Sequence, residues 1–249
     1  MLKHRLATAI FAIAIGEILF FCDLGSPMFY FGLGLSTIVY LIVEFFGAYF
    51  IGLNFHLKSL NYLDKNKNKI ALTFDDGPSQ PQTLKVLEAL KKHGVKATFF
   101  VIGKNIKGNE TILQQIINEG HSIGSHSFSH HFWIDMWGKS KLEEDILESL
   151  NAIRLVTGKD VKIIRPPYGV TTPNFRSVFR KLKLQSVGWN VRSYDTAAKE
   201  MNKVLNRVLS KTKSGSIILL HDKPDFIPEL LDKLIPALKQ KNFEFVSIS

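Results

Sequence analysis

Beyond residue 69, short apolar segments rich in β-branched and aromatic residues alternate with segments of helical periodicity, and this alternation constrains the fold more than any other feature. Strands are predicted at residues 70–74, 97–102, 122–124, 161–164, 186–189, 217–220 and 243–248. Helices are predicted between most of them, at residues 82–93, 110–119, 141–157, 173–181, 201–211 and 226–241. Strands that alternate with helices form a parallel sheet. Over about 180 residues the pattern predicts a closed or nearly closed α/β barrel, with a doubly wound open sheet as the alternative.

The first sixty residues differ from the rest because they contain two long apolar segments. Residues 6–22 are apolar except for Glu17, and residues 27–53 are apolar except for Glu44. Each segment is close to the roughly 20 residues that a helix needs to span a bilayer, and the short turn between them predicts a transmembrane helical hairpin. A cleaved signal peptide is the alternative, because the N-terminus is basic. The two glutamates are expected to lie near the membrane interface or to share a polar contact between the helices, rather than to carry the chemistry.

The domain organisation follows from these segments. Residues 1–60 hold the two membrane helices, residues 61–68 form a polar linker, and residues 69–249 form the α/β domain. We therefore expect an integral protein of the cell membrane that contacts lipid through the hairpin. Lysine and arginine flank both ends of the hairpin and are missing from its turn, so the positive-inside rule places the domain in the cytoplasm. Cell-wall chemistry would require the opposite side, and both orientations stay open.

The chain has a formal net charge of +10 and a single cysteine, Cys22. A basic surface favours acidic partners such as anionic lipid, acidic cell-wall polymers or nucleic acid. No nucleic-acid-binding motif and no basic-aromatic stripe occurs, so nucleic acid is not expected as a partner. One cysteine permits no disulfide within the chain and excludes a cysteine-rich zinc site. Any metal ion must therefore be held by histidines and carboxylates.

Ionisable side chains follow five of the predicted strands at their C-terminal ends. They are Asp75 and Asp76, His126 and His130, Arg165, Asp195, and His221 with Asp222. In α/β barrels the active site lies at this end of the strands. Five separate strand ends that each deliver an ionisable group predict one shared site rather than surface decoration.

The carboxylate pair and the histidine pair predict a metal site. Adjacent carboxylates repel each other, so one of Asp75 and Asp76 is expected to bind a cation or to have a raised pKa; a solvated Asp-Gly turn is the alternative. His126 and His130 are four residues apart and can face one ion from a compact loop, and neutral imidazole suits zinc and its neighbours. Two histidines and one carboxylate, with a position left for water, form the ligand set of a catalytic zinc site. The second carboxylate is then free to act as a base.

Together these motifs resemble those of the polysaccharide deacetylases of carbohydrate esterase family 4, the NodB homology domain. They stand here as Thr73-Phe74-Asp75-Asp76-Gly77, His126-Ser127-Phe128-Ser129-His130, Arg165-Pro166-Pro167-Tyr168-Gly169, Asp195 and Leu219-Leu220-His221. Their order and spacing agree with the family, and the resemblance covers roughly residue 69 to the C-terminus. It implies a distorted (β/α)7 barrel and one divalent metal ion, most often zinc.

The resemblance also implies a role for each matching residue. The implied metal ligands are Asp76, His126 and His130. Asp75 would be the general base that deprotonates the attacking water, and Arg165 would position it. Asp195 would tune His221, which would be the acid that protonates the leaving amine.

The same resemblance implies how the substrate is held. The backbone N–H of Tyr168 would help to hold the oxyanion. The substrate would contact the side chains of Tyr168, Leu219 and Trp189. One departure from the family is Thr196, which follows Asp195 where many members have a tryptophan that lines the acetyl pocket.

The expected activity is metal-dependent hydrolysis of N-acetyl or O-acetyl groups on an acetylated polysaccharide, such as peptidoglycan or another GlcNAc-containing glycan, with release of acetate. Two alternatives stay open: an inactive, membrane-tethered glycan-binding module, and a deacetylase of a lipid-linked glycan precursor. A glycosidase that uses Asp75 and Asp195 as its carboxylate pair would leave the two histidines unexplained. The sequence predicts neither the polymer nor the oligomeric state.

Overall fold

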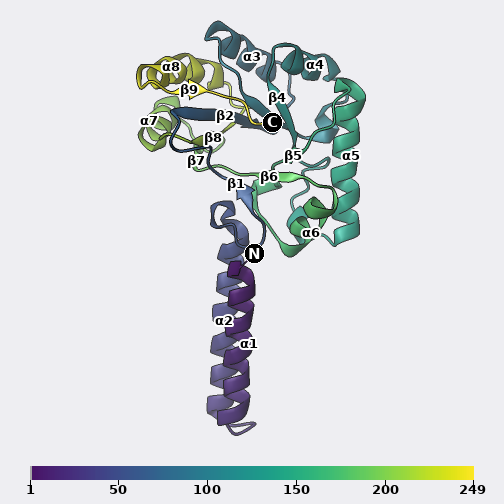
Figure 1. Ribbon diagram of the computed structural model, residues 1–249, viewed down its shortest axis with the longest axis vertical. Helices are drawn as coiled ribbons and strands as arrows, with labels where there is room; N and C mark the ends of the chain where they lie inside the picture. The colour runs from purple at the N-terminus through teal and green to yellow at the C-terminus, as the bar shows by residue number, and fades with distance from the viewer. Residues whose placement is uncertain (1) are drawn as a thin grey trace.

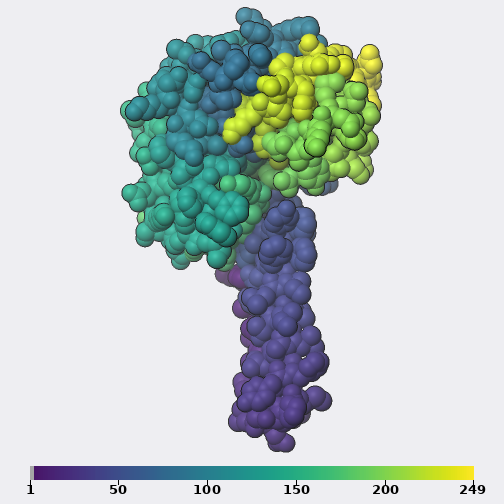
Figure 2. All heavy atoms as spheres, turned by 180° about the vertical axis from the view of Figure 1, so that it is seen from behind, coloured from purple at the N-terminus to yellow at the C-terminus, as the bar shows by residue number. Residues whose placement is uncertain are grey.

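The computed structural model describes residues 2–249 and shows a narrow helical stalk below an α/β domain (Figure 1). Helices α1 (Leu2–Phe21) and α2 (Pro27–Tyr49) form the stalk as a hairpin. Ser26 caps α2 by accepting a hydrogen bond from the N–H of Phe29 at 3.2 Å, and Pro27 takes the first helical position, where no N–H is needed. The same stalk is seen from behind in Figure 2.

Both helices are long and apolar enough to cross a membrane. The candidate spans are Lys3–Phe21 and Pro27–Tyr49, and neither is buried within the molecule. The second is shorter than the predicted segment 27–53, because the helix ends at Tyr49 and a one-turn helix, η1 (Ile51–Leu53), follows. The last residues of the predicted segment therefore belong to the junction with the domain.

One nine-stranded sheet forms the centre of the domain. Its strands are β1 (Ser59–Leu60), β2 (Lys69–Asp75), β3 (Thr98–Val101), β4 (Ser122–Ser125), β5 (Ile163–Ile164), β6 (Gln185–Val187), β7 (Val191–Arg192), β8 (Ile217–His221) and β9 (Glu244–Phe245). The order is β1-β6-β5-β4-β3-β2-β8-β7, and β9 pairs with β2 beside this path. Every pair of these strands is parallel, so their C-terminal ends meet at one edge.

Helices cover the outside of the curled sheet (Figure 1). The longer ones are α3 (Gln82–Lys92), α4 (Glu110–Asn118), α5 (Lys139–Thr157), α6 (Pro173–Lys181), α7 (Met201–Lys211) and α8 (Ile227–Gln240). The one-turn helices are η2 (Gly103–Asn105), η3 (Ile134–Met136) and η4 (Pro167–Gly169). The amphipathic faces of α3, α4, α7 and α8 bury their leucines, isoleucines and valines in one large core cluster against the sheet.

The prediction of a parallel α/β sheet is confirmed, but the sheet curls into an incomplete barrel instead of closing. The two ends of the strand path, β1 and β7, are not paired with each other among residues 2–249, and β9 pairs with Lys69 and Ile70 of β2 instead of extending the path. Two short strands that were not predicted, β1 and β7, form the ends of the path.

The chain joins the sheet before the predicted linker at residues 61–68. β1 pairs with β6, Asn61 is buried, and Tyr62 forms an isolated antiparallel bridge with Ser216. Only residues 64–68 run as an exposed segment. The hairpin is therefore connected to the domain through a strand of the central sheet.

Strand β2 shows how the sheet positions the polar residues. Successive side chains of a strand point to opposite faces. Leu72 and Phe74 pack into the large core cluster under the helices. Thr73 and Asp75 point to the other face, where both contact Arg165. The alternation thus places one carboxylate of the Asp75–Asp76 pair on the inner face of the curled sheet.

Candidate active site

A cavity of about 300 Å³ lies at the C-terminal ends of the strands. The lining residues come from six different strands or from the loops that follow them. They are Asp75, Asp76, His126, His130, Tyr168, Gly169, Trp189, Arg192, Tyr194, Thr196, Ala197, Leu219 and His221. Of the residues predicted for the site, only Arg165 and Asp195 are not among them, and both are buried directly behind the cavity wall.

The two adjacent aspartates point in different directions. β2 ends at Asp75, and Asp76 takes the left-handed conformation with φ of 75°. Asn105 stabilises this turn by donating from its side-chain amide to the carbonyl of Asp76 at 2.9 Å. Asp75 accepts a hydrogen bond from Arg165, whereas Asp76 faces the histidine loop. The positive φ of Asp76 separates two carboxylates that would otherwise repel each other.

Asp76, His126 and His130 form a cluster whose ligand atoms all lie within 4.8 Å of one another. The Asp76 carboxylate oxygen is 3.7 Å from Nε2 of His126 and 3.5 Å from Nε2 of His130. Ligand atoms bound to zinc at roughly 2.0–2.1 Å lie about 3.4 Å apart at tetrahedral angles. The spacing and the donor set therefore fit a zinc ion.

The histidines are held in the form that binds a metal. Nδ1 of His126 donates to the carbonyl of Arg165 at 2.8 Å, which leaves Nε2 unprotonated and facing Asp76. Burial lowers the pKa of His130 to about 4, so its imidazole is neutral at pH 7. Burial raises the pKa of Asp76, but the cationic groups around it, including Lys223, outweigh this effect, so the pKa is lowered overall and the carboxylate is ionised.

The loop between the two histidines is fixed by α5. The backbone N–H groups of Phe128 and Ser129 donate to the carboxylate of Asp145 at 2.9 and 3.0 Å. His130 takes a positive φ of 48°, and its N–H donates to the hydroxyl of Ser127 at 3.0 Å. This compact loop turns both imidazoles to the same side, as the spacing of four residues predicted.

Arg165 is fully buried and holds Asp75 in place. Its guanidinium donates to Oδ1 of Asp75 at 2.7 Å and to the hydroxyl of Thr73 at 2.8 Å. It also donates to the carbonyl of Gly188 at 2.9 Å and lies 4.2 Å above the ring of Phe100. Burial lowers the pKa of Arg165, and the Asp75 charge opposes this. Since Arg165 occupies Oδ1, the other oxygen of Asp75 faces the cluster of possible metal ligands, 3.7 Å from Nε2 of His126.

His221 and Asp195 form a second charged pair across the cavity. Oδ1 of Asp195 is 2.8 Å from Nδ1 of His221, and Oδ2 accepts from the His221 backbone N–H at 2.6 Å. The hydroxyl of Ser193 and the N–H of Thr196 also donate to this carboxylate, at 2.9 and 3.0 Å. Burial lowers the pKa of His221, but the Asp195 hydrogen bond and charge outweigh it, so the pKa is raised.

Comparison with known proteins identifies the family. The sequence pattern described as polysaccharide deacetylase matches residues 63–187. A peptidoglycan-N-acetylglucosamine deacetylase of Bacillus cereus is 37% identical over 192 residues, which cover 74% of this chain and 68% of that protein. This chain belongs to the polysaccharide deacetylase family.

Two further relatives agree with this assignment. The peptidoglycan-N-acetylmuramic acid deacetylase PdaC of Bacillus subtilis is 31% identical over 187 residues, which cover 75% of this chain and 39% of that protein. The crystal structure of the Bc1960 peptidoglycan N-acetylglucosamine deacetylase aligns with a TM-score of 0.73 and 34% identity, covering 76% of this chain and 89% of that one. The prediction that the chain is a polysaccharide deacetylase is confirmed.

In this deacetylase, Tyr168 lies at the mouth of the cavity. It takes a positive φ of 60°, and its ring lies 4.7 Å from that of His130. Among residues 2–249 its backbone N–H forms no hydrogen bond to a residue outside its own one-turn helix. Gly169 follows with φ of 71°, and a Cβ there would collide with the ring of Trp189. The two rigid prolines before Tyr168 and this close contact after it fix the position of the loop.

Three lining residues were not predicted. Arg192 ends the short strand β7, which has no recognisable periodicity in the sequence, and Tyr194 and Ala197 follow that strand. The Arg192 guanidinium lies 5.1 Å from the centre of the Tyr194 ring. Thr196, which stands where many family members have tryptophan, also lines the cavity. These side chains form part of the cavity wall together with the predicted residues.

Asp222, which was noted with His221, does not line the cavity. It is fully buried and accepts a hydrogen bond from the hydroxyl of Thr83. Burial raises its pKa to about 6. A Cβ on Gly77 would collide with its carboxylate. Asp222 therefore packs beneath the turn that carries Asp75 and Asp76 and supports that turn.

Proposed function

We propose that this chain hydrolyses N-acetyl groups of a glycan at a single zinc site held by Asp76, His126 and His130. The observation that carries the proposal is the placement of two oriented proton-transfer groups in one cavity with the metal cluster. Asp75 is held by Arg165, and His221 is held by Asp195. A bound divalent ion supplies Lewis-acid activation of water and of the acetamide carbonyl.

The residues then have separate tasks. Asp75 takes a proton from the attacking water through Oδ2, because Oδ1 is held by Arg165. The backbone N–H of Tyr168 donates to the oxyanion of the tetrahedral intermediate. His221 donates its Nε2 proton to the leaving amine, because its Nδ1 proton is held by Asp195. The carbon–nitrogen bond breaks, and acetate and a free amino sugar leave.

The substrate class is inferred from the relatives and from the size of the cavity. The relatives named above act on N-acetylglucosamine and N-acetylmuramic acid residues of peptidoglycan. A cavity of about 300 Å³ is at the lower end for small-molecule sites and suits one acetylated sugar of a longer chain. We infer that the substrate is peptidoglycan or another glycan that contains N-acetylglucosamine. In this site Tyr168, Trp189 and Leu219 contact the sugar and its acetyl group.

We also propose that α1 and α2 anchor the enzyme in the cell membrane. Large apolar side chains are exposed along both helices and at the tip of the hairpin, where Phe21 and Leu24 are each 78% exposed. Contiguous apolar surface of this length is costly in water and favourable in lipid. The anchor keeps the α/β domain, residues 69–249 with β1, at the membrane surface. A glycan attached to a membrane lipid is therefore the second candidate substrate.

Two competing functions are less well supported. An inactive glycan-binding module would need no paired acid and base, yet both charged pairs are complete. A glycosidase that uses Asp75 and Asp195 would need both carboxylates free to face the sugar, but the Asp195 carboxylate is buried and accepts hydrogen bonds from His221, Ser193 and Thr196.

Asp75→Asn tests the proposal. It should lower acetate release from acetylated peptidoglycan fragments by about 10²- to 10⁴-fold, the usual contribution of a general base, and leave zinc content unchanged. His126→Ala should lose both zinc and activity. Asp232→Asn, an exposed carboxylate on α8, is the matched control and should change neither. Near-normal turnover of Asp75→Asn would show that Asp75 is not the base.

A further inference from the structure

A second group of metal-ligating side chains meets at the junction between the hairpin and the domain. His4 comes from α1, Glu44 from α2, and His56 from the segment that leads into β1. Their ligand atoms all lie within 4.8 Å of one another, the same limit that the cavity cluster meets. These three residues, which we call the junction cluster, are distant in the sequence and lie outside the region matched to the family.

The distances in the junction cluster suit a metal ion. Nδ1 of His4 is 3.0 Å from one oxygen of Glu44, and Nε2 of His56 is 3.4 Å from the other. Ligands of a tetrahedral zinc ion lie about 3.4 Å apart. The contact of His56 with Glu44 is not among the hydrogen bonds of residues 2–249, and the same holds for His130 with Asp76 in the cavity. His4 does form a hydrogen bond with Glu44 through Nδ1, so both imidazoles of the junction cluster face the same carboxylate.

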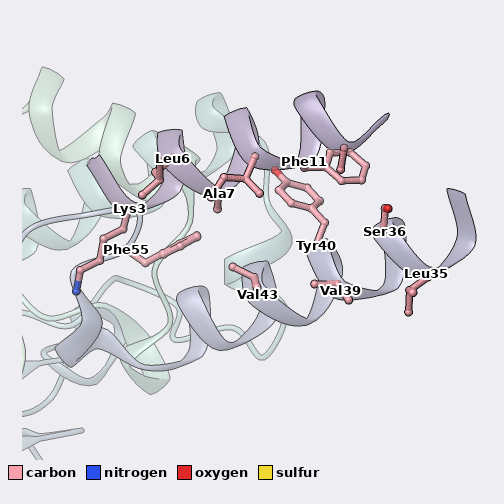
Figure 3. A pocket seen from close by; sticks show the side chains of 12 residues that line it. Lys3, Leu6, Ala7, Phe11, Leu35, Ser36, Val39, Tyr40, Val43 and Phe55 are labelled. Atoms are coloured by element: carbon pink, nitrogen blue, oxygen red, sulfur yellow. The ribbon is translucent and has the colours of Figure 1, made fainter. Parts of the chain in front are cut away.

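The surroundings would hold such an ion in a partly enclosed place. His56 is buried, whereas the side chains of His4 and Glu44 are 24% and 23% exposed. The ring of Phe55 lies 5.6 Å from that of His4 and 4.8 Å from that of His56. Figure 3 shows Phe55 and Lys3 at one end of an apolar groove of about 530 Å³ between the two helices. Because the side chains of His4 and Glu44 are partly exposed, water can reach the cluster as a further ligand.

The position of the junction cluster explains what an ion there would do. Next to it, α2 is tied to the active-site loop, because the carbonyl of Ala48 accepts from the N–H of Thr171 at 3.0 Å. Thr171 follows the segment that carries Tyr168. By contrast, the start of α1 reaches this junction mainly through side chains, including Lys3, whose ammonium donates to the carbonyl of Leu53 at 2.9 Å. A metal ion bound to all three ligands would fasten α1, α2 and the entry to β1 to one another.

We propose that His4, Glu44 and His56 bind a second divalent metal ion, with zinc as the best fit, which fastens the membrane hairpin to the catalytic domain. Two imidazoles and one carboxylate are ligands that zinc accepts, and water completes the four. The site is separate from the catalytic one and does not depend on the function proposed above.

The experiment counts zinc in the full chain, purified in detergent, stripped with a chelator, reloaded with zinc chloride and freed of unbound metal. Mass spectrometry of the metal should give about two ions per chain, one for each three-ligand cluster. Glu44→Gln and Asp76→Asn should each leave about one, and the double variant should leave none. Glu119→Gln is the matched control, since it alters another Glu–His pair, with His121, that has no third ligand.

A thermal melt gives a second readout that is independent of activity. Zinc should raise the melting temperature of Asp76→Asn, in which only the junction cluster is intact, and should not do so when Glu44→Gln is added. His4→Gln, at the exposed start of α1, replaces Glu44→Gln if that variant does not fold. One zinc ion per chain that Asp76→Asn removes and Glu44→Gln leaves in place would overturn the proposal, and the junction cluster would then be only a hydrogen-bonded contact.

Discussion

Replacing Asp195 with asparagine tests the acid half of the site. In the native structure the carboxylate accepts from Nδ1 and from the backbone N–H of His221, and from the side chain of Ser193. An asparagine can keep only one acceptor oxygen and puts an amide N–H₂ group in place of the other. If the oxygen stays with the backbone N–H, the amide faces Nδ1 and cannot accept its proton. His221 then loses the partner that stabilises its charged form.

The size of the effect follows from the type of interaction that is lost. A hydrogen bond to a charged group contributes about 1.5–3 kcal/mol. Since about 1.36 kcal/mol corresponds to a tenfold change in rate, kcat/KM should fall roughly 10- to 150-fold near neutral pH. The direction in which activity changes with pH also follows from this pair. Asp195 raises the pKa of His221, and the acid works only below that pKa, so activity is lost as the pH rises through it. The variant should lose activity at a lower pH than the native enzyme does.

The assay is acetate release from acetylated peptidoglycan fragments across a pH series, with zinc content measured on the same samples. Asp232→Asn is the matched control, because it also replaces an aspartate that lies 2.8 Å from a histidine nitrogen, that of His93, on the surface. It should leave the pH profile unchanged. If Asp195→Asn lowers the rate equally at every pH, then Asp195 only shapes the loop, and the reasoning that it sets the protonation of His221 is wrong.

Two further substitutions test how the site is built. Arg165→Met should destabilise the protein by about 3–5 kcal/mol, because it leaves Asp75 as a buried charge without a partner. At roughly 2–4 °C per kcal/mol, the melting temperature should fall by about 6–20 °C. Adding Asp75→Asn should restore part of this loss. An unchanged melting temperature would contradict this account. Gly169→Ala should lower the free energy of unfolding by about 1–3 kcal/mol and raise KM, because the new methyl group meets Trp189 and φ is positive. Gly138→Ala is the control, because a Cβ there meets nothing within 4 Å, and it should change neither the melting temperature nor the acetate assay.

Much of the fold could be predicted because its strands and helices are long enough to show a period. Strands such as β2 and β8 are continuous apolar runs buried on both faces, and the helices between strands carry one apolar face. The two-residue strands β1 and β7 are too short to show any period. How far the barrel closes also could not be predicted, because it depends on whether the terminal strands β1 and β7 meet, and that is decided by long-range packing.

The site was predictable where its residues form compact motifs at strand ends. The parts that were missed depend on contacts that the sequence spacing does not record. Arg192 reaches the cavity from the end of the short strand β7 and Tyr194 from the loop after it, where Tyr194 has a positive φ of 59°. The junction cluster joins three positions separated by forty and by twelve residues, on three elements. Glu44 does share a polar contact between the helices, as predicted, with His4, but the participation of the domain through His56 could not be inferred from the apolar segments.

The Asp75–Asp76 pair shows how the backbone assigns different tasks to identical side chains. Strand alternation directs Asp75 to the inner face, where a buried arginine already has its other donors engaged by Thr73 and Gly188. The chain then leaves the strand through a left-handed residue, and the next carboxylate turns to the histidine loop. A glycine must follow because the buried Asp222 occupies the space of a Cβ. The proposed division between base and metal ligand is thus set by the backbone dihedral of Asp76 and by the residues packed below the turn, because the two carboxylates are chemically identical.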